Sequence, residues 1–244
     1  MHDLLELSIG AHGRLERWNQ LRQISAAAAI GGIALKQRGQ EAFTQMPTRV
    51  TVDTREQKTI FDPFLALGQR GIFEPSRTVI ESFDGTLLEE LKDPRNSFES
   101  QALGAPWAAT QLACFAGYAM WMYLTVPFSL LRSGIEYEKI EPWVEDGERW
   151  RALKLTLPTS YVTHSTEQTL YFDDKGLIRR HDYTVEISGD RKASHYLHDH
   201  RMFDGVMFPT RRRVYLRGPD LKPQKDLVVI SADLDDFKLS SVAP

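Results

Sequence analysis

The sequence predicts an α+β protein that is mainly antiparallel β, in which helices cover one face of a single curved sheet. Short Asp- and Gly-containing links separate runs of alternating apolar and polar residues between 164 and 203. Asp84-Gly85 joins two more such runs, at 79–83 and 87–91. Residues 107–123 (WAATQLACFAGYAMWMY) are apolar on every side, as in a helix that is buried against a concave apolar surface.

The first half is expected to begin with an amphipathic helix over residues 1–13, ended by Gly10 or Gly13. A first strand set over residues 14–92 follows, with strands expected at 18–32, 48–54, 59–61, 79–83 and 87–91. Residues 93–106 contain Pro, Gly, Asn and Ser and predict a loop. An apolar helical insertion over 106–133 comes next.

The second strand set is expected over residues 135–239, with strands at 151–157, 164–172, 177–187, 192–203, 206–216 and 227–234. Pro209 implies an edge or a bulge in its strand. Residues 143–150 are expected to form a turn, and the carboxylate-rich stretch 141–148 is interpreted as solvated. Because no long Gly/Ser/Pro linker interrupts the 244 residues, we expect one domain over 1–244.

A polar cluster is predicted on the inner face of the second set. Pairing Phe172 with Leu177 places Gln168 opposite His181, and the alternation turns the odd residues of 177–187 inward. The side chains gathered on this face are then His164, Gln168, His181 and Tyr183. A two-residue turn at Gly189-Asp190 would add His198 beside His181, but a slip of one residue reverses that face.

Composition excludes several classes of protein. The formal net charge is −3, and the only dense basic run is Arg211-Arg212-Arg213, so no nucleic-acid partner is expected. The single cysteine, Cys114, allows no intrachain disulfide. No basic segment leads into an apolar run at the N-terminus, which predicts a cytoplasmic protein. The sequence sets no oligomeric state.

The apolar helix is interpreted as a buried plug and not as a membrane span, since Gln111 and Pro127 interrupt it and no basic residues flank it. No stable membrane insertion is therefore expected. A helix of this kind can enclose a hydrophobic ligand. The aromatic side chains expected to line such a site are Trp107, Phe115, Tyr118, Trp121 and Tyr183. The alternative is that each belongs to a dry core.

The order of elements resembles that of the LolA/LolB-like lipoprotein-carrier superfamily. The resemblance is carried by the hairpin YFDDKGLI and by the strand entered through DGVMFPTRRRV at residues 204–214. The chain is also similar to bacterial proteins of this length that carry WRALKLTLP and RHDY segments. The resemblance implies a half-closed antiparallel barrel with helices in its concave face, which holds acyl chains. It also implies that cofactor-free chemistry is possible, because the same fold hosts such chemistry elsewhere.

Two hypotheses for function follow. The first is a soluble protein that binds a hydrophobic or amphipathic small molecule, lipid-like or polycyclic, in the concave face. The second is a cofactor-free isomerase, cyclase or dehydratase that acts on such a ligand. Its proton shuttle would be His181, because a histidine that titrates near neutrality suits that task. The residues expected to assist it are His164, Gln168, Tyr183 and His198.

Arg179, beside His200 on the inner face, is the expected anchor for a ligand carboxylate. A strand places His198 and His200 on one face and His195 on the other, so no metal site is predicted. No cofactor is predicted either, because the sequence contains no P-loop, dinucleotide fingerprint, Gly-x-Ser-x-Gly elbow or Cys-x-x-Cys pair.

Overall fold

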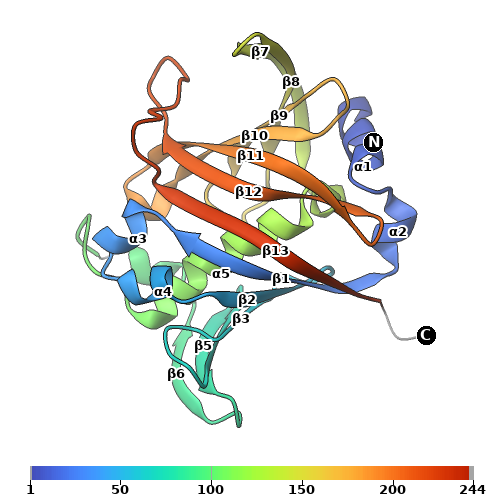
Figure 1. Cartoon of the computed structure of the whole chain (residues 1–244). Coiled ribbons are helices and arrows are strands. Elements are labelled where there is room, and N and C mark those ends of the chain that lie inside the picture. Colours follow the sequence, from blue (N-terminus) through green and yellow to red (C-terminus); the bar gives the residue numbers. More distant parts are fainter. Residues whose placement is uncertain (1, 100, 242–244) are drawn as a thin grey trace.

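The computed structural model describes residues 2–99 and 101–241, and these form one curved, unclosed antiparallel sheet covered by helices (Figure 1). Within that range the sheet has 13 strands in the order β6-β5-β4-β3-β2-β1-β13-β12-β11-β10-β9-β8-β7. The predicted α+β, mainly antiparallel architecture is confirmed. Residues 1, 100 and 242–244, which belong to the predicted helix, loop and tail, lie outside the described residues.

The strands of the first half are β1 (Leu21–Gly31), β2 (Thr48–Asp53), β3 (Thr59–Asp62), β4 (Gln69–Glu74), β5 (Arg77–Ser82) and β6 (Leu87–Lys92). Those of the second half are β7 (Glu136–Glu145), β8 (Glu148–Thr156), β9 (Glu167–Phe172), β10 (Ile178–Val185), β11 (Arg191–Phe203), β12 (Val206–Leu216) and β13 (Ile230–Ser241). The α-helices are α1 (Asp3–Ala11), α2 (Leu15–Asn19), α3 (Ile33–Gln37), α4 (Glu41–Gln45) and α5 (Ala109–Thr125). Three short 3-10 helices are η1 (Asn96–Phe98), η2 (Phe128–Leu131) and η3 (Glu186–Ser188).

The first and last strands join the two halves of the sheet. Each half is a meander in which consecutive strands pair, and β1 then pairs with β13, for example Ile24 with Leu239 and Ala28 with Leu234. Both halves also contribute to one apolar core, which includes Phe73 and Leu155. The two predicted strand sets therefore share one sheet and one core.

The predicted apolar helix is α5, and it crosses the concave side of the sheet (Figure 1). Every residue from Thr110 to Thr125 is buried. Close packing against β3 and β4 requires Gly117, because a Cβ there would lie 2.2 Å from the Cβ of Phe73. The hydroxyl of Thr59 donates a hydrogen bond to the Gly117 carbonyl at 2.8 Å. Within the described residues, no helix is long and apolar enough to cross a membrane.

Several elements differ from the prediction. The helices α3 and α4 and the strand β4 were not expected, and the alternation of β4 is interrupted at Gly71, which the Phe64 ring covers. The turn expected at 143–150 is confined to the residues between Glu145 and Glu148, because Trp143 pairs with Trp150. The last strand also continues beyond Leu234 to its end at Ser241, since β1 pairs along it.

The predicted register of the polar cluster is wrong, although its inner face is correct between β9 and β10. A bulge at Arg179 places His181 opposite Leu170 and Tyr183 opposite Gln168. The pairing is thus displaced by two residues from the expected one, and a displacement of two keeps each side chain on its face.

The predicted pairing of β10 with β11 is displaced by an odd number of residues, so it assigns the wrong residues of β11 to the inner face. The η3 turn makes the link from Val185 to Arg191 longer than two residues, and His181 lies opposite His195. His198 therefore projects from the other face, where its ring stacks on Tyr196 with centroids 6.1 Å apart.

Candidate ligand-binding cavity

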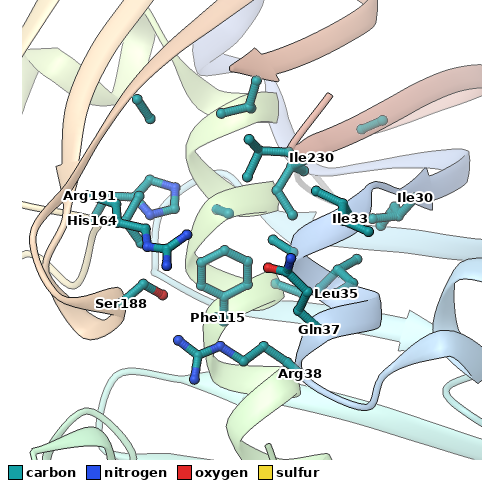
Figure 2. Close-up of a pocket in the computed structure, with 18 of the residues that line it drawn as sticks. Ile30, Ile33, Leu35, Gln37, Arg38, Phe115, His164, Ser188, Arg191 and Ile230 are labelled. Carbon is teal, nitrogen blue, oxygen red and sulfur yellow. The ribbon is translucent and has the colours of Figure 1, made fainter. Parts of the chain in front are cut away.

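A cavity of about 390 Å³ lies between α5 and the strands β10–β13, beside α3 (Figure 2). The helix packs closely on the first half of the sheet. Against the second half the facing side chains are small, and Ala116, Ala119, Ala193 and Ala232 all line the cavity. These alanines leave room that larger side chains would fill. The volume falls within the range of small-molecule sites.

One face of α5 forms the cavity wall. The residues concerned are Phe115, Ala116, Ala119, Met120 and Tyr123. Their spacing follows the helical repeat, so Tyr118 and Trp121 point elsewhere. Tyr118 packs edge-on against Phe73, and the Trp121 indole donates to the Asp53 carbonyl at 2.8 Å. Of the predicted lining residues, Trp107, Phe115 and Tyr183 line the cavity, whereas Tyr118 and Trp121 do not.

His164 and Tyr183 form a polar strip of the lining. Their rings are stacked, with centroids 4.2 Å apart. Within the part of the chain that the structure describes, neither ring nitrogen of His164 has a hydrogen-bond partner. Burial, and then the nearby His181 and Arg95, hold the pKa of His164 well below its usual value. The ring is therefore neutral at pH 7.

His181 and Gln168 lie behind this strip and do not line the cavity. The Gln168 amide nitrogen donates to the Thr163 hydroxyl and to the Ser165 carbonyl, both at 2.8 Å. Its oxygen is left to accept from Nε2 of His181 at 2.6 Å. Burial and the charge of Arg212 lower the pKa of His181 to about 3. The premise that His181 titrates near neutrality is wrong.

His181 borders instead a small space of about 10 Å³ that it shares with His12 and Arg212. Arg212 is buried and donates a hydrogen bond to the Tyr123 carbonyl. His195 was not among the predicted site residues, but it lies beside His181 on β11, where His198 was expected. The centroids of the His195 and Tyr123 rings are 4.4 Å apart. Burial also lowers the pKa of His195 well below its usual value.

Known proteins with a similar chain path were found among solved structures. The chain is similar to a LolA superfamily protein from Nitrosomonas europaea, with a TM-score of 0.55 at 15% identity over 98% of this chain and 93% of that one. It is also similar to a DUF1329 family protein from Desulfovibrio piger, with a TM-score of 0.55 at 9% identity over 99% and 93%.

A third similar structure is a domain from Vibrio parahaemolyticus assigned to outer membrane lipoprotein sorting, with a TM-score of 0.54 at 10% identity over 98% and 93% of the two chains. The chain shares the fold of these LolA-like structures. At these identities the likeness establishes the architecture and not the activity. No family model matches the sequence, and neither does any curated protein.

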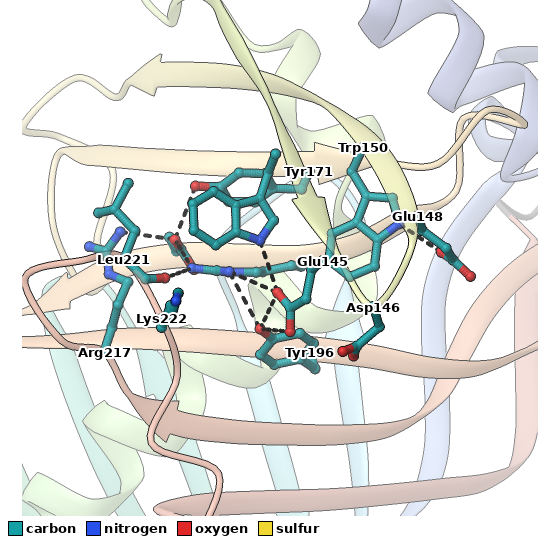
Figure 3. A network of polar contacts seen from close by, with 12 residues as sticks. Glu145, Asp146, Glu148, Trp150, Tyr171, Tyr196, Arg217, Leu221 and Lys222 are labelled. Atoms are coloured by element: carbon teal, nitrogen blue, oxygen red, sulfur yellow. Dashed lines mark hydrogen bonds and ion pairs between the residues drawn. The ribbon is translucent and has the colours of Figure 1, made fainter.

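The LolA-like sheet carries a second polar cluster on its outer face (Figure 3). Arg180 is fully buried and binds Asp182 through two hydrogen bonds of 2.8 Å, and its Nη1 lies 3.2 Å from Glu145. Arg217 contacts the same Asp182 at 2.9 Å, and the Tyr196 hydroxyl bonds Glu145 at 2.8 Å. Glu145 comes from the stretch interpreted as solvated, and that interpretation is wrong for Glu145, whereas Glu141, Asp146 and Glu148 are exposed as expected.

Each charged side chain of this cluster has an ion-pair partner, although Nε of Arg217 has no hydrogen bond within the described residues. The cluster lies on the face opposite the cavity, and we interpret it as a network that stabilises the sheet. The predicted anchor Arg179 is half-buried at the bulge in β10 and does not line the cavity. Across residues 2–99 and 101–241, no group of three or more His, Cys, Asp or Glu side chains is arranged to hold a metal ion.

Proposed function

We propose that this protein binds a hydrophobic or amphipathic small molecule between α5 and strands β10–β13. The observation that carries the proposal is the cavity of about 390 Å³, whose wall is mostly aliphatic and aromatic. Apolar side chains such as Ile30, Met120 and Val214 would remove an acyl chain or a ring system from water. The LolA-superfamily fold supports the same proposal by analogy.

Native mass spectrometry of the purified protein, followed by calorimetric titration with decanol and decanoate, tests this proposal. We expect a retained hydrophobic molecule or saturable binding of at least one of the two chains. Ala119→Trp would fill the cavity and should abolish the binding, because the indole would occupy the space beside Ala116. Ala102→Trp is the matched control, since Ala102 is exposed and does not line the cavity. Equal binding by both variants would contradict the proposal.

A second candidate is cofactor-free acid–base chemistry on the bound molecule, and one observation favours it. His164 and Tyr183 are side by side in the lining, and the nitrogens of His164 are free of partners within the described chain. A general base works best with a pKa near the working pH. Because the pKa of His164 is far below that range, we favour binding over catalysis.

This second candidate assigns proton transfer to His164 and not to His181, because only the former reaches the cavity. Replacing His164 with Asn would abolish turnover of a molecule recovered from the protein while leaving it bound. Turnover that survives His164→Asn but is lost in His181→Asn would assign the proton transfer to His181, as the sequence predicts.

A further inference from the structure

Two arginines from different elements line the cavity. Arg38 follows α3 and Arg191 begins β11, and Figure 2 shows both near Phe115. Arg191 is exposed and marks the mouth of the cavity, together with the exposed Gln37. Within the described residues, no Asp or Glu side chain lines the cavity. Positive charge is thus concentrated there in a protein whose formal net charge is −3.

Arg38 is held in place by contacts that leave part of its guanidinium group available. Its Nη1 donates to the Ala105 carbonyl at 3.0 Å, and the guanidinium carbon lies 5.1 Å from the centre of the Trp107 ring. Burial lowers the pKa of Arg38, and the charge of Arg191 lowers it further. Because both guanidinium groups line the same cavity, their like charges repel each other, and an anion between them would relieve that repulsion.

Two further donors of the lining are unpaired. Trp107 and His164 are 6% and 3% exposed, and within the part of the chain described here the Trp107 indole nitrogen and both His164 nitrogens have no hydrogen-bond partner. A buried donor without a partner costs free energy, which a ligand with acceptor oxygens would recover. Carboxylate and phosphate groups supply such oxygens.

We propose that the ligand is an amphipathic acid, whose apolar chain lies between α5 and the sheet and whose carboxylate or phosphate group is held at the mouth by Arg38 and Arg191. This inference rests on the proposed function and narrows its ligand class. Arg38 and Arg191 take the role that the sequence had suggested for Arg179.

The test compares four ligands that share a ten-carbon chain, namely decanoate, decyl phosphate, decanol and decyltrimethylammonium. Calorimetric titration at pH 8 and below the micelle concentrations gives a Kd for each. We expect an anion to bind about tenfold more tightly than decanol, which is the effect of one charge-assisted contact. The comparison of decanoate with decyl phosphate identifies the headgroup. Added NaCl should weaken the binding of the anion and leave that of decanol unchanged.

Arg191→Gln and Arg38→Gln test the two positions. Each should remove most of the preference for the anion, measured as the ratio of the Kd of decanol to the Kd of the anion in the same variant. Arg38 is buried, so Arg38→Lys, which keeps the charge, provides a second variant that should retain the preference. Arg211→Gln is the matched control, because it removes one positive charge from an exposed position outside the cavity.

The outcomes separate this inference from the proposed function. If decanol binds as tightly as both anions, or if decyltrimethylammonium binds best, the inference fails while the proposed function stands. A preference for anions that survives in Arg191→Gln and in Arg38→Gln overturns the assignment to these arginines. If none of the four ligands binds, this inference fails, and the proposed function fails with it when native mass spectrometry also finds no retained hydrophobic molecule.

Discussion

At the residue scale, the histidines beneath the concave face are neutral at pH 7 because they are buried. Burial lowers the pKa of His12 to about 4 and that of His181 to about 3, from an ordinary value of about 6.5. The unfolded chain therefore binds these protons at a higher pH than the folded one. The resulting stability is complete above pH 6.5 and is lost progressively as the pH falls toward the folded values.

We expect the free energy of unfolding to fall between pH 6.5 and pH 4.5 by about 2 kcal/mol for each of these two histidines. Urea denaturation followed by circular dichroism measures it. His181→Gln should reduce the slope by the share of one histidine, because glutamine does not titrate. A stability that stays constant over this pH range would contradict the burial of neutral rings.

The buried Arg180 provides a second prediction at this scale. Arg180→Met would remove one partner of the fully buried Asp182, which keeps Arg217, and would leave Glu145 without Arg180. We expect a loss of about 3 kcal/mol in the free energy of unfolding, because breaking a buried ion pair leaves an uncompensated charge. Arg211→Met is the control, and its exposed, distant contact with Asp199 at 3.9 Å should contribute under about 1 kcal/mol.

At the scale of one element, α5 decides where the cavity lies. Its helical repeat sends Gly117 toward β4 and the pair Ala116 and Ala119 toward β10–β13. Because α5 packs closely on β4 and presents small side chains to β10–β13, the cavity lies between α5 and the second half of the sheet.

Gly117→Ala should destabilise the fold by about 1–3 kcal/mol, because the new methyl group would overlap Phe73 and the core is closely packed. Gly10→Ala in α1 is the matched control: nothing lies within 4 Å of its added Cβ, and alanine favours helix. The control should leave stability unchanged or raise it. Thermal denaturation compares the two variants, and equal melting temperatures would show that α5 does not approach β4 this closely.

At the scale of the whole molecule, local patterns predicted the antiparallel sheet and its internal helix, because alternation and turn chemistry act over a few residues. The register in which neighbouring strands pair was harder to predict from the sequence. The bulge at Arg179 and the η3 turn each shift the pairing, and neither has a distinctive local signal. That is why His181 and Gln168 were placed together correctly while His198 was chosen in place of His195.

The two arginines at the mouth of the cavity could not be predicted from the sequence, for a different reason. Arg38 and Arg191 are far apart in the sequence and line the same cavity only because β1 pairs with β13 and α5 crosses the concave side of the sheet. Long-range contacts of this kind leave no periodic trace in a single sequence. Trp107 and Phe115, in contrast, were correctly predicted to line the cavity, because a continuous run of apolar residues indicates a buried helix in the sequence alone.

The central claim is that the gap between α5 and β10–β13 holds the apolar part of a ligand. A crystal structure of the protein with 10-bromodecanoate, in which anomalous scattering locates the bromine, tests it most directly. The account predicts bromine inside the cavity beside Ala116 and Ala119, with the carboxylate toward Arg38 and Arg191. Bromine bound only on the outer surface, or a protein that excludes the acid at saturating concentration, would contradict it.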